Sequence, residues 1–294
     1  MTSRDATAAE ALSKGAYLGP VGDPTRILHE RVVDDVVVQM ERGHPAVDAV
    51  ASSARDGGKT LDLLATAGPW ETATAGAEDL GGMALVPVVG VPNPSRAVVA
   101  KRFVDIAGAI VGLVLLSPIL AAAAIAILMT DGRPILFTQP RAGLNGRPFR
   151  IVKFRTMTRD ADAQRDALRA RNEISGSASF KLAQDPRVNR VGHLLRRSSI
   201  DELPQLWNVL RGEMSLVGPR PHPFDDVAGY APWHHRRLSV KPGITGLWQV
   251  KGRLDPSFDH WVELDLEYID HWSLWLDFQL LLQTVPALLR AEGR

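Results

Sequence analysis

One stretch of the chain, residues 106–130, is apolar and contains no charged side chain. A helix of this length can cross the ~30 Å hydrocarbon core of a bilayer, whereas buried helices of soluble proteins rarely lack charge over so many turns. The pattern therefore predicts that this stretch is embedded in a membrane.

A Ser-Pro pair, Ser117 and Pro118, lies at the middle of this stretch. Pro118 has no backbone N–H, and its ring collides with the carbonyl of Val114, at a cost of about 3 kcal/mol or more inside a helix. We expect the helix to bend here. The Ser117 hydroxyl is expected to donate to the carbonyl of Leu113 and so ease the break within lipid.

Basic residues flank the apolar stretch on both sides. Lys101 and Arg102 precede it. The basic residues that follow it are Arg133, Arg141, Arg147 and Arg150. Because positive charge favours the cytoplasmic side, the flanks indicate a re-entrant helix-break-helix hairpin over residues 101–130 that dips into one leaflet. A single crossing kinked at Pro118 is the alternative, since proline also occurs in spanning helices.

The pattern before the hairpin predicts a tail and a small α/β region. Residues 1–30 are polar and rich in small residues, which is typical of a disordered or loosely ordered tail. Within residues 31–97, β-branched runs at 32–40 and 82–91 predict strands, and residues 44–54 predict a helix. This is about half of a Rossmann-like unit. It has no glycine-rich turn after a strand, so we expect no nucleotide site there.

The pattern after the hairpin alternates short strands and helices. Short runs at 134–137 and 149–154 predict two strands joined by a glycine-rich turn, and apolar spacing predicts a helix over 199–210. Residues 159–171 predict a polar helix, and the serine-rich residues 173–181 predict a mobile loop.

The C-terminal stretch, residues 272–289, is strongly apolar but interrupted by polar residues and a proline. Those interruptions are Asp277, Gln279, Gln283 and Pro286. An amphipathic helix at the membrane interface and a buried core helix are the two interpretations. The expected fold is therefore mixed α/β and mainly helical, with a small sheet, a membrane hairpin and interfacial amphipathic helices.

The composition limits the class of protein. A chain of 294 residues has room for one or two domains, and the absence of cysteine excludes a disulfide framework or a thiolate metal site. The first fifteen residues lack the apolar core of a signal peptide. The histidines show no metal-ligand spacing, and we expect His234 and His235 to lie on an exposed polar helix.

The net charge of +1 conceals an asymmetry. Residues 1–100 carry 8 Lys and Arg against 13 Asp and Glu, whereas residues 133–220 carry 17 against 8. A basic surface beside a membrane segment attracts anionic headgroups, and it also suits a site that handles phosphate. Nucleic acid is not an expected partner, because the basic residues are not interleaved with aromatic ones.

Two adjacent carboxylates, Asp201 and Glu202, follow Arg196 and begin a predicted helix. One interpretation is structural, with Ser199 as the N-cap residue and Glu202 closing a capping box. Pro204 argues weakly against it, because proline is less comfortable there than at the first helical position. The other interpretation is catalytic.

A third candidate residue, Arg220, lies between Pro219 and Pro221. The two prolines restrict the backbone, so they would hold the guanidinium in place for a bidentate contact with phosphate. The alternative is an exposed arginine in a proline-stiffened loop.

Taken together, these segments resemble the catalytic domain of the bacterial sugar transferase family, the monotopic polyprenyl-phosphate phosphoglycosyl transferases. The matching segments, in chain order, are residues 101–105, 117–118, 153–157, 199–210, 214–221, 241–246, 248–250 and 252–253. The resemblance covers residues 98–292. Residues 1–97 resemble the remnant of a Rossmann-like domain that longer members carry after several transmembrane helices, so the chain is a naturally short form or a truncated one.

The resemblance implies transfer of a sugar-1-phosphate from a UDP-sugar to polyprenyl (undecaprenyl) phosphate, with release of UMP. Such a reaction is the first membrane step of exopolysaccharide, capsule, O-antigen or glycoconjugate synthesis. It implies a bacterial inner-membrane protein in contact with membrane lipids, with its active site on the cytoplasmic face; we favour a homodimer. No motif fixes which sugar is transferred.

The same resemblance implies roles for individual residues. Asp201 would be the nucleophile that forms a covalent sugar-phosphoryl aspartate. Asp201 and Glu202 would hold Mg²⁺, which with arginines neutralises the reacting anions. Arg220 would bind the nucleotide phosphate and Arg196 the lipid phosphate. The other expected substrate contacts are Lys153, Arg155, Pro219 and Pro221.

Two other functions stay open at this point. A true glycosyltransferase acting on a lipid-linked acceptor would release UDP instead of UMP. An inactive membrane-bound scaffold would release no nucleotide.

Overall fold

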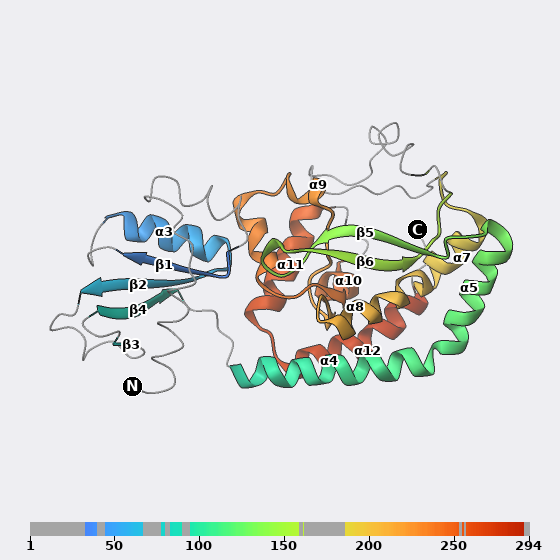
Figure 1. The fold of residues 1–294 in the computed structure, drawn as a ribbon, viewed down its shortest axis with the longest axis horizontal. Helices are drawn as coiled ribbons and strands as arrows, with labels where there is room; N and C mark the ends of the chain where they lie inside the picture. Colours follow the sequence, from blue (N-terminus) through green and yellow to red (C-terminus); the bar gives the residue numbers. More distant parts are fainter. Residues whose placement is uncertain are drawn as a thin grey trace. The chain divides into compact units, whose positions relative to one another are not determined.

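The computed structural model describes residues 33–39, 45–66, 78–79, 83–89, 95–158, 161, 186–252, 255 and 257–290. The predicted tail over residues 1–30 and the predicted loop over 173–181 lie outside this part of the chain, as does all of the predicted polar helix except Ala161. The chain divides into two compact units, residues 1–92 with 231–239 and residues 93–230 with 240–294 (Figure 1).

The first unit is a small α/β structure. Its strands β1 (Asp35–Gln39) and β2 (Thr60–Thr66) pair in parallel and are joined through helix α3 (Pro45–Asp56). Strand β4 (Met83–Val89) pairs antiparallel with β2. The short strand β3 (Glu78–Asp79) pairs antiparallel with the other edge of β4. The two predicted strands and the predicted helix are confirmed, whereas β2 was not foreseen.

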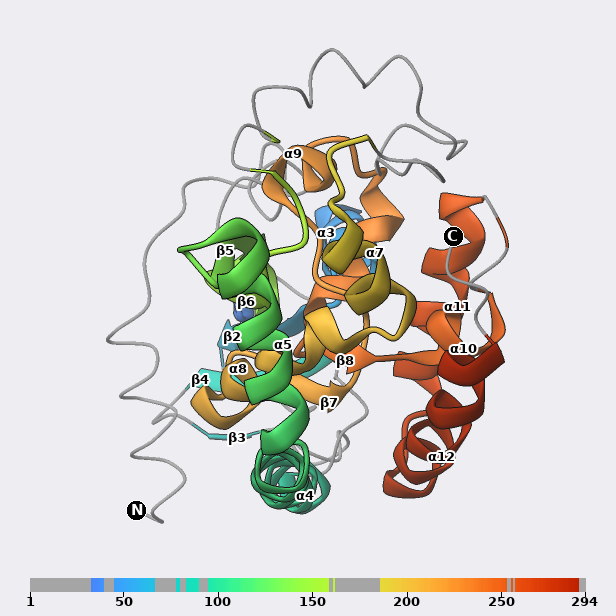
Figure 2. The ribbon, with the colours of Figure 1, turned by 90° about the vertical axis from the view of Figure 1, so that its right-hand side faces the viewer.

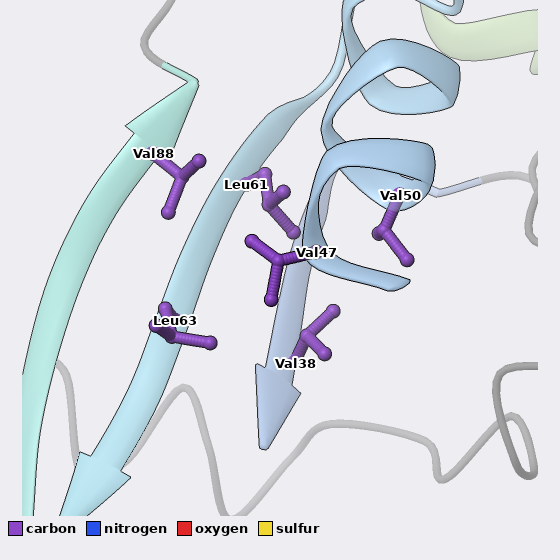
Figure 3. A pocket seen from close by; sticks show the side chains of 6 residues that line it. All are labelled: Val38, Val47, Val50, Leu61, Leu63 and Val88. Carbon is purple, nitrogen blue, oxygen red and sulfur yellow. The ribbon is translucent and has the colours of Figure 1, made fainter. Parts of the chain in front are cut away.

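The core of this unit lies between the sheet and α3. Alternate residues of β2 are buried, because successive side chains of a strand point to opposite faces. Figure 3 shows the apolar side chains that converge there from β1, α3, β2 and β4. They are Val38, Val47, Val50, Leu61, Leu63 and Val88.

The short 3₁₀ helix η4 (Pro232–Ser239) belongs to the same unit and packs against α3. His234 and Arg237 are buried in it, so the predicted exposed polar helix is wrong at these positions. The His234 ring lies edge-on to Trp233 with 4.2 Å between ring centroids. A polar composition predicted exposure, but the packing of this segment against α3 buries two of its side chains.

The second unit begins with two helices, α4 (Ser95–Leu115) and α5 (Ser117–Asp131), which are bent by 60° at their junction (Figure 1). No single helix in the described part of the chain is long and apolar enough to cross a bilayer, but this bent pair has the length and composition. Both helices expose large apolar side chains. Among them are Phe103, Ile110, Val114, Leu115, Ile125 and Met129.

The break has a local cause. Pro118 stands in the first turn of α5, where a missing N–H costs little. The Val114 carbonyl would have accepted from residue 118, and the Ser117 hydroxyl donates to it instead at 2.8 Å. The expected bend is confirmed, but the acceptor is Val114 and not Leu113. The serine therefore satisfies the group that the proline leaves without its helical donor.

The middle of this unit carries the predicted strand pair. Strands β5 (Leu136–Ala142) and β6 (Pro148–Phe154) form an antiparallel hairpin closed by the 3₁₀ turn η1 (Leu144–Gly146). This confirms the two predicted strands and lengthens both. The described chain resumes at residue 186, and helix α7 (Arg190–Arg197) follows.

The helix expected over residues 199–210 is present in two parts. Residues Ile200–Gln205 form the 3₁₀ helix η3, and α8 (Leu206–Arg211) continues from it. Ser199 has a left-handed backbone with φ 54°, which turns the chain sharply out of α7. Pro204 lies within η3 and removes one backbone donor from it.

The last part of the unit packs against α4 and α8 through β7. Strand β7 (Ser215–Val217) pairs in parallel with β8 (Gly243–Thr245). The remaining helices are α9 (Phe224–Val227), α10 (Leu247–Lys251), α11 (Phe258–Asp270) and α12 (Leu274–Arg290). The described chain is thus mixed α/β and mainly helical, as predicted.

Two apolar clusters join the bent helices to the rest of the unit. In α4, Ala109 is buried in a cluster that includes Ile151 of β6 and Val209 of α8. In α5, Ile127 is buried in another that includes Leu195 of α7. Each helix therefore has one face in the core and one face exposed.

Helix α12 packs against α10, beside which it lies in Figure 2. Its side chains divide into a buried and an exposed face. Asp277 and Leu280 are buried, whereas Trp275 is 64% exposed and Phe278 and Leu282 are exposed as well. The core interpretation is thus correct for one face. The other face keeps the exposed aromatic and apolar side chains on which the interfacial interpretation depends.

Candidate active site

The adjacent carboxylates Asp201 and Glu202 lie on η3, between α7 and α8. Ser199 makes no side-chain hydrogen bond to cap this helix, so the capping-box interpretation is wrong. Its left-handed backbone does not present the hydroxyl to the helix N–H groups. The Glu202 side chain binds residues from two other segments instead.

Glu202 is bound by two cations that are distant in sequence. The Arg220 guanidinium makes a bidentate contact, with Nη2 at 2.6 Å from Oε1 and Nη1 at 3.2 Å from Oε2. The Lys153 ammonium of β6 donates to the same Oε1 at 2.7 Å. Arg220 is therefore not a free surface arginine, and both oxygens of Glu202 are engaged.

The Glu202 charge favours the ionised forms of Arg220 and Lys153, and their charges favour that of Glu202. Burial alone would raise the pKa of Glu202, but Arg220 and Lys153 hold it well below its ordinary value. The Glu202 charge raises the pKa of Arg220. Burial lowers the pKa of Lys153, and Glu202 opposes that shift. Glu202 is thus an anion that keeps the two cations in place.

Asp201 differs from its neighbour. It is only 8% exposed, and no hydrogen bond to its side chain is found within the described residues. Burial, and then the negative charge of Glu202, raise the pKa of Asp201 to about 6, against the opposing effect of Lys153, Arg196 and Arg220. A buried carboxylate with little solvation and no direct partner is chemically more basic than an exposed one.

Arg196 stands in the last turn of α7, just before η3. Its Nε donates to the Thr156 hydroxyl at 2.9 Å, which fixes the guanidinium near Asp201. Helix α7 begins at Asn189, whose side chain accepts from the Gly192 N–H. A Cβ on Gly192 would lie 2.1 Å from the Thr156 carbonyl oxygen, so only glycine allows α7 to approach the end of β6 this closely.

The Pro-Arg-Pro turn is anchored through its backbone. The Pro219 carbonyl accepts from the Gly243 N–H at 2.8 Å, and the Pro221 carbonyl accepts from Arg141 at 3.1 Å. Both prolines are buried. The backbone on either side of Arg220 is therefore held, while its side chain reaches Glu202.

Arg155 is not brought to the two carboxylates. Its Nη2 donates to the carbonyls of Asp131 and Gly132, each at 2.9 Å. These carbonyls lie at the C-terminal end of α5, where a cation is favourable. The structure thus gathers Asp201, Glu202, Lys153, Arg196 and Arg220, and places Arg155 at the end of the bent helix pair.

The donor set can be compared with the needs of Mg²⁺. Within the described residues, no group of three or more His, Asp or Glu side chains could hold a metal ion. Mg²⁺ usually keeps several waters and binds one or two carboxylates together with substrate phosphates. The buried Asp201 carboxylate fits that mode, whereas both oxygens of Glu202 are already bound by cations.

Several buried polar residues near this site were not singled out by the sequence. Asp105 of α4 accepts from the Ser215 hydroxyl and from the Leu216 N–H, both at 2.9 Å. Asn208 of α8 donates to the Arg150 carbonyl and accepts from the Val152 N–H. They hold β7 and β6 against the helices. Both lie in segments that resemble the family, residues 101–105 and 199–210, but the sequence analysis gave neither residue a role.

The basic residues before the apolar stretch also have specific partners. Lys101 is bound to the carboxylate of Asp277, and Arg102 donates to the carbonyls of Val209 and Leu210. Both lie within α4, and they are therefore not free flanking charges.

The sequence is similar to those of known proteins. The sequence profile described as "Bacterial sugar transferase" matches residues 96–291. The galactosyl transferase CpsE of Streptococcus agalactiae serotype III is 47% identical over 196 residues, covering 66% of this chain and 43% of that protein. The UDP-galactose-lipid carrier transferase of Erwinia amylovora is 40% identical over 196 residues, covering 66% and 41%.

A third relative matches over more of its own length. The UDP-glucose:undecaprenyl-phosphate glucose-1-phosphate transferase of Caulobacter vibrioides is 43% identical over 215 residues, covering 69% of this chain and 75% of that protein. The match spans less than half the length of the first two relatives. Since the family profile covers about two thirds of the sequence, the chain belongs to the bacterial sugar transferase family.

Proposed function

We propose that this chain transfers a sugar-1-phosphate from a UDP-sugar to polyprenyl phosphate, specifically undecaprenyl phosphate, and releases UMP. The observation that carries the proposal is the buried Asp201 carboxylate, whose pKa is raised to about 6, beside the cation-bound Glu202. The name of the Caulobacter relative describes the same class of reaction.

Asp201 is the nucleophile in this proposal. One of its carboxylate oxygens bonds to the β-phosphorus of the UDP-sugar, the bond from that phosphorus to the bridging oxygen breaks, and UMP leaves. An oxygen of the lipid phosphate then bonds to the same phosphorus, and the bond to Asp201 breaks. The products are the lipid-linked sugar diphosphate and the free carboxylate. Burial favours the first step because it leaves the carboxylate poorly solvated.

Glu202 acts as a positioning residue. Its contacts hold the Lys153 ammonium and the Arg220 guanidinium side by side, so two cations are fixed close to the nucleophile before substrate binds. Preorganised charges of this kind stabilise the transition state without further rearrangement. Arg220 faces the nucleotide phosphates, and Arg196, on the α7 side of Asp201, faces the lipid phosphate.

Mg²⁺ is the cofactor we propose, held by Asp201 together with the diphosphate of the donor. When bound it neutralises phosphate charge that would otherwise repel the carboxylate. Glu202 contributes to this site through the cations it orients, and a direct contact with the metal would require it to release one of them.

The bent pair α4–α5 is the membrane anchor in this proposal, inserted as a re-entrant hairpin in one leaflet with the active site on the cytoplasmic face of the bacterial inner membrane. Its exposed apolar face supports insertion, and Trp275 on the outer face of α12 supports a second contact at the interface. The hairpin places a lipid acceptor and a cytosolic donor at one surface.

The test is nucleotide release by the purified full chain with undecaprenyl phosphate, Mg²⁺ and a panel of UDP-sugars. UMP release with at least one sugar is expected, and Asp201→Asn should abolish it while Asp48→Asn, an exposed carboxylate on α3, should not. Release of UDP would indicate a glycosyltransferase, and no nucleotide with any donor would favour a scaffold. Either result would overturn the proposal.

The covalent step has its own test. A UDP-sugar labelled in the β-phosphate, supplied without undecaprenyl phosphate, should transfer label to the wild-type protein but not to Asp201→Asn. Adding the lipid phosphate should then remove the label. UMP release without any labelled protein under rapid quenching would argue for direct transfer.

A further inference from the structure

A second group of cations lies where α4 passes the end of α8. The Arg102 guanidinium of α4 donates to the last carbonyls of α8, at 2.6 Å to Val209 and 2.8 Å to Leu210. Gly212 ends this helix with a left-handed backbone, φ 81°. The guanidinium thus lies beside Gly212, which has no side chain to cover it.

The Lys241 ammonium reaches the same place from the segment before β8. A Cβ placed on Gly212 would lie 3.5 Å from Arg102 Nη2 and 3.8 Å from Lys241 Nζ, and would meet no other residue more closely. Both cations therefore lie within 4 Å of one position beside the glycine. Like charges this close repel unless an anion lies between them.

Among the described residues, the Asp105 carboxylate acts on Lys241 through its charge but makes no hydrogen bond or ion pair with it. In the part of the chain that the structure describes, the Lys241 ammonium has no hydrogen-bond or ion-pair partner. Burial lowers its pKa, Arg102 and Lys101 lower it further, and Asp105 opposes them. Asp105 accepts from Ser215 and Leu216 through its Oδ1, and Lys101 is paired with Asp277.

The surroundings of the two cations are apolar and exposed. Val98 and Val99 precede Arg102 by four and three positions on α4, so they share its helix face. Val99 is 69% exposed, Val98 is exposed as well, and the adjoining Phe103 is 73% exposed. A ligand at this position would meet positive charge at one end and apolar surface at the other.

We propose that Arg102 and Lys241 bind the phosphodiester headgroup of an anionic membrane phospholipid, whose acyl chains lie along the exposed apolar residues of α4. A free phosphate ion would use the two cations but not Val98, Val99 or Phe103, so the lipid accounts for more of the surface. The inference rests on the membrane insertion proposed above and not on the transferase reaction.

Native mass spectrometry of the full chain in detergent micelles can test this site. The protein is incubated with mixtures of phosphatidylglycerol and phosphatidylcholine in varied ratio. The fraction of protein that retains one molecule of each lipid is then measured. We expect phosphatidylglycerol to be preferred, and Lys241→Gln to weaken its binding about fivefold, the effect of one basic residue at a lipid surface. Lys241→Arg should keep the preference.

The matched control is Lys251→Gln, which removes an exposed lysine that pairs loosely with Glu267 at 3.6 Å. It should leave lipid binding unchanged. Equal retention of the two lipids, equal binding by wild type and Lys241→Gln, or an equal loss in the control would overturn the proposal. So would inorganic phosphate that displaces the lipid at matched concentration, because the site would then belong to free phosphate.

This outcome is separable from that of the proposed reaction. UMP release reports on the transferase step, and flotation of the wild type with phosphatidylcholine vesicles reports on insertion of α4 and α5. A protein that floats and releases UMP but shows no preference for phosphatidylglycerol overturns the headgroup site alone.

Discussion

The ammonium of Lys101 lies 2.6 Å from a carboxylate oxygen of Asp277, which joins the first helix of the apolar pair to the last helix of the chain. Asp277 also accepts from the Tyr268 hydroxyl at 2.7 Å and from the Trp272 indole at 3.2 Å. Lys101 and Tyr268 in turn donate to the Val217 carbonyl, each at 3.1 Å. The network thus ties both helices to the strand that leads into the Pro-Arg-Pro turn.

Removing the carboxylate should strongly destabilise this unit. Asp277→Ala leaves the partly buried Lys101 ammonium without its carboxylate and the buried Tyr268 hydroxyl without one acceptor, and breaking such an ion pair costs up to about 3–5 kcal/mol. The exposed pair Lys251–Glu267 is the control, and Glu267→Ala should cost less than about 1 kcal/mol. Chemical denaturation in detergent micelles measures both. Similar losses in the two variants would show that the Asp277 network contributes little.

The contrast between Asp277 and Asp201 shows how far the sequence could lead. The resemblance to the family identified Asp201, Glu202, Lys153 and Arg220 together, because each lies in a segment that matches it. Helical periodicity treated Asp277 only as an interruption of an apolar helix. Its partner lies 176 positions earlier, and no local pattern carries a contact at that separation.

Local rules were also least reliable where a backbone departs from regular geometry. The spacing of Ser199 and Glu202 suits a capping box, but Ser199 has a positive φ, so Glu202 is directed to Lys153 and Arg220 instead. The Ser117-Pro118 break was predictable because proline acts on its own helix. The pairing of Glu202 with Lys153 and Arg220 was not predictable from local rules, because these partners come from a strand and a loop elsewhere in the chain.

The rate should depend on pH through Asp201. The nucleophile must be deprotonated, and its pKa is raised to about 6, so kcat/KM should rise with pH and level off above that value. Burial is the larger cause of the raised pKa of Asp201 and the Glu202 charge the second. Glu202→Gln removes that charge, so the acid limb should move part of the way to lower pH. UMP release between pH 4.5 and 8 measures it. An acid limb that stays in place or moves upward would contradict the assignment.

The Asp201 carboxylate should also lower the free energy of unfolding at neutral pH. Its folded-state pKa lies above the ordinary value of 3.8, so the folded protein binds the proton more tightly than the unfolded chain. The free energy of unfolding is therefore unaffected below about pH 3.8, falls as the pH rises from there to about 6, and stays lowered above that. Asp201→Asn should raise the free energy of unfolding at pH 8 by up to about 3 kcal/mol, and by less at pH 5. Stabilisation that does not depend on pH would point to another cause.

Gly192 provides a test of the contact between α7 and β6. Helix propensity alone favours alanine over glycine by about 1 kcal/mol. In this structure a Cβ would meet the backbone oxygen of Thr156 at 2.1 Å, so Gly192→Ala should destabilise by about 1–3 kcal/mol and reduce UMP release by displacing Arg196. Gly108→Ala is the control.

That control glycine also lies inside a helix, but its Cβ would meet only the end of the Leu216 side chain, which can turn aside. The Gly108→Ala variant should therefore lose less stability than Gly192→Ala and keep its activity. Thermal unfolding and UMP release of both variants decide the matter. A stabilised Gly192→Ala would show that α7 does not pack this closely on Thr156.

Pro118 should determine whether the bent helices return to one side of the membrane. Pro118→Leu restores a backbone N–H, so the Val114 carbonyl regains its helical donor and the Ser117 hydroxyl is no longer needed there. Helices α4 and α5 can then join into one straight helix long enough to span a bilayer.

Because the chain has no cysteine, single cysteines at Arg96 and Arg133 report the side of each end without background labelling. With a membrane-impermeant maleimide applied to intact spheroplasts, both sites should be protected in the wild type, and position 133 should become labelled in a fraction of Pro118→Leu molecules. Ala122→Leu adds a leucine to α5 without changing the backbone, and it should label as the wild type does. Labelling of position 133 in the wild type would instead establish the single kinked crossing.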